Sequence, residues 1–297
     1  QAQVVQAGGS PGFNFAGFTQ NNTQVEAFAF GNTSLAEESA NTFTLGAVLT
    51  PNLGLGRFSA TVDWYDIDIK DYVTAIGATT IFGSCRQAAE ALGAAAANDP
   101  FCLRIIRDPV TGQADFINTT IENSGRLKVS GVDGQLNYSV PFNDLGIGIP
   151  GRLRLQEIIS WLDYYEFNGT DFGGTTGGGI GGTLPEWKST LTVAYDSDDF
   201  TAQMRWNWQS DAEDINSFSC DPGDDCAPDL EGLNYFDLSL RKSIGNNFEL
   251  TGIVQNLFNQ KAKKSVSGFG AEGGTDVGYW NPVILGRFFT VQGKVKF

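Results

Sequence analysis

The C-terminal stretch "VILGRFFTVQGKVKF", Val283 to Phe297, has the alternation of a β-strand with two different faces. Successive side chains of a strand point to opposite faces of a sheet. One face of this strand carries Phe289, Val291, Gly293, Val295 and Phe297, and the other carries Thr290, Gln292, Lys294 and Lys296. Such a strand needs an apolar environment on one side only, which is either a protein core or lipid.

The same period of two recurs along the chain, in residues 42–50, 57–64, 132–140, 187–195, 200–208, 235–241 and 248–255. Short connections (51–56, 141–151, 196–199, 244–247) alternate with long ones (about 75–115, 168–184, 210–231, 259–282). A soluble β-sandwich also alternates its side chains, but it has no reason to keep the long loops at one end. Outer-membrane barrels have this layout. The pattern therefore favours an all-β fold, an antiparallel transmembrane β-barrel segment with long extracellular loops.

One segment departs from the pattern. In "RLRLQEIISWLDYY", Arg152 to Tyr165, Glu157 shares a face with Leu153 and Trp161. A carboxylate that faces lipid at the middle of the bilayer is costly. Two interpretations remain open: a bulge near Gln156 shifts the alternation, or Glu157 lies close to the rim of the barrel.

The composition excludes several functions. The 297 residues include 34 Asp or Glu and 19 Lys or Arg, a formal net charge of −15, which argues against nucleic acid as a partner. There is no His, so this chain cannot supply a Ser-His-Asp site, and we expect neither an enzyme nor a cofactor. The glycine-rich stretch "GGTTGGGIGG", residues 173–182, lacks the Lys-Ser/Thr of a phosphate-binding loop.

The four cysteines form two local pairs, Cys85 with Cys102 and Cys220 with Cys226. An even number of cysteines, close together in pairs within loop-like segments, predicts disulfides in an oxidising compartment. Metal binding is the alternative, but it lacks support from His or from C-x-x-C spacing. Between the first pair, the Ala-rich run from Ser84 to Asp99 predicts a short helix with Ser84 as its N-cap.

The long loops hold the other candidate sites. We expect no metal site in this chain. The alternative is a Ca²⁺ site in the segment from Asp211 to Glu231, which is rich in carboxylates but lacks the EF-hand spacing. Four aromatic residues near an outer strand end are candidates for stacking on a substrate, although anchoring at the lipid interface needs no ligand and is the favoured interpretation: Trp161, Tyr164, Tyr165 and Phe167.

Five segments resemble the C-terminal portion of TonB-dependent outer-membrane receptors: residues 31–51, 62–73, 123–138, 254–262 and 281–297. In that family a strand-entry pattern is written N-x-x-L-x-x-E, and Leu35, Glu37 and Glu38 match it, with Ala36 and Glu37 where Lys-Pro is common. The terminal Phe297 resembles the signal read by the barrel-assembly machinery.

The resemblance implies a barrel of about 22 strands around an N-terminal plug. This chain would supply about nine C-terminal strands, with residues 1–40 as an extracellular loop region, residues 41–297 as transmembrane strands and no plug. The C-terminus would be periplasmic. Because open strand edges are not tolerated in hydrocarbon, the missing strands come either from a second polypeptide split off in an outer loop or from the rest of one longer chain.

The resemblance also implies a function, the energised uptake of a scarce nutrient such as a siderophore or an oligosaccharide. The expected partners are the plug, the remaining strands, the TonB complex, outer-membrane lipid and the barrel-assembly machinery. Residues expected to face the lumen and the plug are Asp133, Gln135, Asn137, Gln203, Arg205, Asn207, Asp237 and Arg241. The alternative is a structural or surface-assembly barrel that anchors partner proteins without transport.

Overall fold

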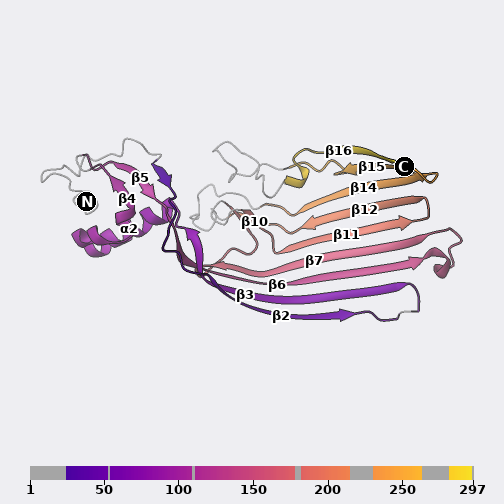
Figure 1. Ribbon diagram of the computed structural model, residues 1–297, viewed down its shortest axis with the longest axis horizontal. Coiled ribbons are helices and arrows are strands. Elements are labelled where there is room, and N and C mark those ends of the chain that lie inside the picture. Colours follow the sequence, from indigo (N-terminus) through magenta and orange to yellow (C-terminus); the bar gives the residue numbers. More distant parts are fainter. Residues whose placement is uncertain are drawn as a thin grey trace. The chain divides into compact units, whose positions relative to one another are not determined.

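The computed structural model describes residues 25–52, 54–108, 111–177, 182–214, 230–262 and 281–295 (Figure 1). It divides them into two compact units. The first comprises the described parts of Gln1–Ala40 and Ile69–Arg126, and the second those of Asn41–Asp68 and Leu127–Phe297. The first unit therefore includes residues 69–126, which the sequence had assigned to the transmembrane region. No described helix is long and apolar enough to cross a membrane.

The second unit is built on one large sheet, in which strands that follow one another along the chain also lie side by side (Figure 1). Its order is β16-β15-β14-β12-β11-β7-β6-β3-β2, and every pairing from β6 to β16 is antiparallel. The nine strands are β2 (Ser39–Leu49), β3 (Arg57–Ala75), β6 (Ile121–Pro141), β7 (Arg152–Phe167), β11 (Trp187–Asp196), β12 (Phe200–Gln209), β14 (Leu233–Ile244), β15 (Phe248–Gln255) and β16 (Phe288–Val295). Of their residues, 39–40, 69–75 and 121–126 belong to the first unit. This sheet confirms the predicted antiparallel barrel segment.

Shorter elements lie in the connections of this unit. β8 (Thr170–Asp171) pairs with the end of β7, and a small sheet joins β10 (Gly182–Leu184), β9 (Thr175–Gly177) and β13 (Glu213–Asp214). Two 3-10 turns are η4 (Phe142–Leu145) and η6 (Asn281–Val283).

The register of the large sheet separates an apolar face from a polar face. Directly opposite residues project on the same side of a sheet, and Leu191 lies opposite Trp206, as Val193 lies opposite Met204. Phe289 and Val291 on the apolar face are 65% and 77% exposed, which is the exposure of a surface solvated by lipid. We define the apolar face of β6 to β16 by Val132, Leu136, Tyr138, Leu153, Leu155, Ile159, Trp161, Trp187, Leu191, Val193, Tyr195, Met204, Trp206, Phe236, Leu238, Leu240, Leu250, Val254, Phe289 and Val291.

Both interpretations of Glu157 are wrong. The pairing of β7 with β11 runs without a shift from Arg152 to Trp161, so no bulge at Gln156 moves Glu157 off the apolar face. Leu153 lies opposite Tyr195 and Trp161 lies opposite Trp187, which places Glu157 four residues from each of these aromatic rows. The carboxylate is therefore on the apolar face and far from both rims.

The first unit has its own small sheet and core. β5 (Ala114–Asn118) pairs in parallel with β1 (Glu26–Phe28) and antiparallel with β4 (Ile105–Arg107). The other elements of the unit are α2 (Ala78–Leu92), η2 (Gly93–Asn98) and η3 (Cys102–Arg104). The buried core residues of this unit are Ile81, Cys85, Ala96, Cys102, Ile105, Ala114 and Ile117.

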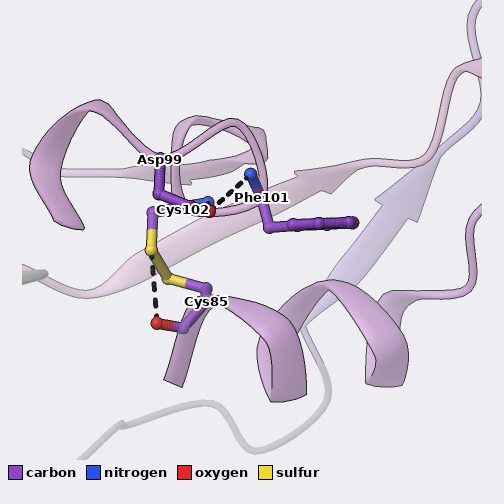
Figure 2. The surroundings of a disulfide bond; sticks show 4 residues. All are labelled: Cys85, Asp99, Phe101 and Cys102. Carbon is purple, nitrogen blue, oxygen red and sulfur yellow. Dashed lines mark hydrogen bonds between the residues drawn. A yellow bond between two sulfur atoms is a disulfide. The ribbon is translucent and has the colours of Figure 1, made fainter. Parts of the chain in front are cut away.

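The predicted disulfide between Cys85 and Cys102 is confirmed, with an S–S distance of 2.07 Å (Figure 2). It joins α2 to η3 at the centre of the core. Asp99 supports the second half of this staple, because its Oδ1 accepts hydrogen bonds from the backbone N–H of Phe101 at 2.9 Å and of Cys102 at 3.4 Å. The other predicted pair, Cys220 with Cys226, lies outside the described residues.

The helix between these cysteines begins earlier than the sequence predicted. α2 starts at Ala78, so Ser84 is inside the helix and is not its N-cap. The reason is burial: Ile81 and Cys85 are four residues apart, share one helical face and are both fully buried. The Ala-rich run that follows forms the 3-10 helix η2 rather than a continuation of α2.

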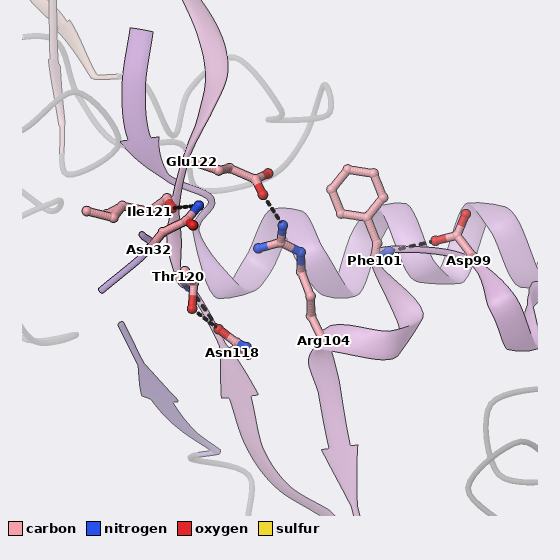
Figure 3. Close-up of polar contacts among 8 residues, drawn as sticks. All are labelled: Asn32, Asp99, Phe101, Arg104, Asn118, Thr120, Ile121 and Glu122. Carbon is pink, nitrogen blue, oxygen red and sulfur yellow. Dashed lines mark hydrogen bonds and ion pairs between the residues drawn. The ribbon is translucent and has the colours of Figure 1, made fainter. Parts of the chain in front are cut away.

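The strand-entry pattern has a clear structural role within the first unit. Asn32 donates through Nδ2 to the carbonyl oxygen of Ile121 at 3.1 Å (Figure 3), and Glu38 Oε1 accepts from the backbone N–H of Val73 at 2.6 Å. Asn123 Nδ2 donates to the carbonyl oxygens of Ala36 at 3.0 Å and of Asp71 at 2.8 Å. These bonds tie the entry of β2 to the ends of β3 and β6.

A second polar contact in the first unit links η3 to the start of β6. Arg104 and Glu122 form an ion pair, with side chains only 19% and 31% exposed (Figure 3). Partial burial makes this pair more constraining than a fully solvated one.

The disulfide generates a stability prediction for the first unit. Replacing both Cys85 and Cys102 with Ala opens a covalent loop with a sequence separation of 17, which costs about 3 kcal/mol in the chain-entropy account. We expect amide hydrogen exchange in α2 and β5 to accelerate about 100-fold. The Arg86→Ala variant is the control, since its side chain is 72% exposed beside Cys85. Unchanged exchange in the double variant would contradict the prediction.

The turn between β11 and β12 generates a pH prediction. Lys242 donates a hydrogen bond to Asp199, and this bond lowers the pKa of the Asp199 carboxyl below its usual value. A depressed folded-state pKa gives a stabilising contribution that is lost as the pH falls through that pKa. Lys242→Met should raise the Asp199 pKa, measured by carboxyl NMR titration of labelled aspartate. Arg154→Met, which removes the cation paired with Asp196 at 3.0 Å, is the control and should leave the Asp199 pKa unchanged.

Candidate functional site

The polar face of the large sheet is the candidate functional surface. Arg205 lies opposite Asp237 on one side and Thr192 on the other, and Thr192 lies opposite Gln156. By this register the structure places all eight residues expected to face the lumen on the polar face: Asp133, Gln135, Asn137, Gln203, Arg205, Asn207, Asp237 and Arg241.

Asp237 is the centre of a hydrogen-bonded group on this face. Its Oδ2 accepts from Asn207 Nδ2 at 3.2 Å, and its Oδ1 accepts from the backbone N–H of Asn256 at 2.9 Å. The amide oxygen of Asn207 accepts in turn from Thr190 Oγ1 at 3.4 Å. Three strands and the turn after β15 are therefore joined through one carboxylate. Nearer the β11–β12 turn, Arg241 donates to Thr201 Oγ1 at 3.0 Å.

A shallow hollow of about 220 Å³ opens beside Asp237. It is lined by Gln203, Arg205, Asp237, Leu238, Ser239, Ile253 and Gln255. A guanidinium and a carboxylate lie opposite one another here, with two amides near them, so the hollow offers both donors and acceptors. That chemistry suits a polar polypeptide surface or a polar ligand, and it provides no nucleophile paired with a base.

Asn256 is a key residue of this surface that sequence reasoning missed. It is 1% exposed and has a φ of +50°. Its side chain donates to the carbonyl oxygen of Gln260 at 2.8 Å and accepts from the Gln260 backbone N–H at 2.7 Å, which closes the turn after β15. The segment 254–262 was noticed for its resemblance to the family, but a buried Asn closing a turn has no periodic pattern to reveal it.

The four candidate aromatics divide between the two faces. Trp161 lies opposite Val132 and stacks on Trp187 at a centroid distance of 5.9 Å, on the apolar face. Beyond it, Tyr164 pairs with Ser130 while Leu162 pairs with Gly131, so Asp163 is an extra residue that shifts the alternation. As a result Tyr164 lies on the apolar face and donates to Asp66, whereas Tyr165 and Phe167 lie on the polar face.

The acidic loop is described only at its two ends. Glu186, Asp211 and Glu213 line a hollow of about 270 Å³ together with Gly174, Ser210 and Ala212. Within the described ranges, no three Asp, Glu, Cys or His side chains are arranged to hold a metal ion. Residues 215–229 of the suggested Ca²⁺ loop lie outside the described part of the chain, as does Phe297.

A sheet of nine strands that is antiparallel from β6 to β16, with one apolar and one polar face there, defines a segment of a transmembrane β-barrel. Residues 3–257 match the family described as TonB dependent receptor-like, beta-barrel. The chain therefore belongs to the TonB-dependent receptor β-barrel family, whose members lie in the outer membrane. A comparison with curated proteins found no match.

Solved structures show the same fold. The ferric enterobactin receptor PfeA from Pseudomonas aeruginosa, in complex with BCV-L6, matches with a TM-score of 0.57 and 16% identity, over 90% of this chain and 33% of the receptor. The siderophore receptor PirA from Acinetobacter baumannii matches with a TM-score of 0.50 and 13% identity, over 89% and 32%. The chain thus spans about a third of the length of these receptors.

The hydrogen bonds of Asp237 generate a prediction about this surface. Asp237→Ala leaves the backbone N–H of the buried Asn256 without its acceptor, which costs about 1–3 kcal/mol. We expect a lower midpoint in urea unfolding of the full-length protein in detergent, followed by tryptophan fluorescence, and a smaller loss for Asp237→Asn. Ser239→Ala, in the same hollow, is the control. Equal midpoints for Asp237→Ala and Ser239→Ala would refute the role of Asp237.

Proposed function

We propose that this chain forms barrel strands and outer loops of an outer-membrane receptor for the energised uptake of a scarce nutrient. The observation that carries the proposal is the polar face, where the group around Asp237 and its hollow form a continuous hydrogen-bonding surface behind a lipid-facing apolar face. Family membership supports transport rather than catalysis.

The partner of the polar face is an N-terminal plug. A barrel of about 22 strands encloses a lumen wide enough for a folded plug. Donors and acceptors lie close together on this face, as Arg205, Asp237 and Gln255 do. Such an arrangement suits hydrogen bonding to a polar polypeptide, whereas an open water channel does not require it. The plug would carry the contact with TonB. The edge strands β2 and β16 need pairing partners within the membrane, and these come from further strands of the same protein or of a second polypeptide.

The substrate class that the comparisons support is a siderophore, because PfeA is a receptor for ferric enterobactin and PirA is a siderophore receptor. An oligosaccharide remains the alternative. Of the four candidate aromatics, we propose that Tyr165 and Phe167, which lie on the polar face, contact the substrate. Trp161 and Tyr164 on the apolar face serve as anchors at the outer lipid interface. With Trp161 and Tyr164 at the outer lipid interface, the first unit is extracellular and the C-terminus is periplasmic.

One observation favours a second function, the anchoring of partner proteins at the cell surface without transport. The first unit has its own buried core, its own sheet and a disulfide, which is more structure than a simple connecting loop requires. A stable module of this kind is suited to presenting a binding surface outside the membrane.

Uptake measurements distinguish the two functions. Iron-starved cells with and without the gene are supplied with radiolabelled iron as a ferric catecholate siderophore, and accumulation is measured over minutes. We expect deletion of the gene to lower accumulation about tenfold and deletion of tonB to lower it equally, because energised release through a plugged barrel needs both. Iron accumulation that is independent of both genes would contradict the uptake function and favour the anchoring function. A large ion conductance of the purified protein in planar bilayers would indicate an open pore and contradict the plugged barrel.

A further inference from the structure

The apolar face carries one carboxylate halfway between its two aromatic rows. Glu157 lies opposite Leu136 on β6 and Leu191 on β11. It is four residues from Leu153 and four from Trp161, which is about 13 Å along the strand in each direction. The apolar band of an outer-membrane barrel is about 25 Å tall, so Glu157 faces outward near the middle of the bilayer.

The carboxylate is largely unsatisfied. Ser189 donates its hydroxyl hydrogen to Glu157 Oε1, and this is the one side-chain partner of Glu157 among the residues described. An ionised carboxylate has about four acceptor positions, and neither Leu136 nor Leu191 offers a donor. Water supplies the missing donors at a protein surface, but acyl chains do not.

The row next to Glu157, toward the outer aromatic residues, consists of Gly134, Ile159 and Ser189. Glycine at position 134 places no side chain on the apolar face beside Ile159, and Ile159 leans over it so closely that a Cβ would lie 2.9 Å from its Cγ2. Ser189, on the other side of Ile159, is short and 8% exposed. Ile159 therefore fills the space over Gly134, and Glu157 beside this row stays partly exposed.

We propose that Glu157 and Ser189 form a docking point within the membrane for a second polypeptide that presents a hydrogen-bond donor, an amide or ammonium group, from its own lipid-facing surface. The donor fills the acceptor positions that Ser189 leaves open, and the flanking Leu136 and Leu191 pack against the apolar side chains around it. This proposal is independent of the transport function.

Charge complementarity selects this occupant over two others. Lipid chains carry no donors, so they leave the carboxylate unsatisfied. A second copy of this chain, related by a two-fold axis that runs along the membrane normal and passes beside Glu157, places Glu157 against Glu157. Like charges in a medium of low dielectric constant repel strongly. Lys242, a cation on the same face, is already paired with Asp199 at the turn.

The test uses the full-length protein in phosphatidylcholine proteoliposomes and two synthetic polyleucine transmembrane helices, one with Gln and one with Leu at its centre. Association is measured by fluorescence energy transfer between the labelled protein and the labelled helix. We expect the Gln helix to associate about tenfold more tightly than the Leu helix, because one hydrogen bond in the membrane contributes at this level.

Variants assign the difference to Glu157. Glu157→Leu should abolish the preference for the Gln helix, and it should fold because it makes the apolar face uniform. Glu157→Gln keeps an acceptor and should retain the preference. Glu249→Leu, which removes a carboxylate from the polar face opposite Lys294, is the matched control and should leave the preference unchanged.

Three results would overturn the proposal. Equal association of the Gln and Leu helices with the wild-type protein would show that the site accepts lipid alone. A preference that persists in Glu157→Leu would place the docking point elsewhere. Energy transfer between two labelled copies of the protein, lost in Glu157→Leu, would identify a second copy as the occupant.

Discussion

The structure depends on one constraint: the backbone N–H and C=O groups of the sheet must hydrogen-bond to one another without help from water. In hydrocarbon every N–H and C=O must be satisfied within the protein. The antiparallel ladder from β6 to β16, with a bulge at Asp163, achieves this between the edges of the sheet. Once the ladder exists, the pleat sends alternate side chains to opposite faces. One face is then apolar over most of its area, with Glu157 as an exception, so the exposure of Phe289 and Val291 is expected of a lipid-facing surface.

The polar face follows a different logic, because its groups must find partners in the interior of the barrel. Asp237 joins β12, β14 and the turn closed by Asn256. The first unit, in contrast, is stabilised as a small water-exposed module is, by the core around Ile81 and the disulfide that crosses it. The chain thus combines a sheet solvated by lipid with a compact unit stabilised by burial and a covalent link.

Much of the fold could be predicted because period-two alternation is a local property. The strand segments, their apolar faces and all eight polar-face residues follow from counting positions, as long as no extra residue intervenes. Counting positions gives the wrong face where an extra residue does intervene: Asp163 shifts the alternation, so Tyr164 lies on the apolar face and Tyr165 on the polar face. The sequence predicted Ser84 as the N-cap because the preference for capping residues is a local property. The helix α2 begins earlier, at Ala78, because Ile81 is buried in a core that also contains the distant Ile117.

By itself the sequence determined the two-faced strands, their meandering order, the cysteine pair that staples the first unit and the family, since each is written in neighbouring residues. Only the tertiary structure decided that Glu157 lies between the aromatic rows, that Asn256 is buried against Asp237 and that Asn32, Glu38 and Asn123 tie three strand ends together. The physical reason is register. Which residue lies opposite which depends on how two strands align, and this is set jointly by the hydrophobic patterns of both strands and by the turn between them.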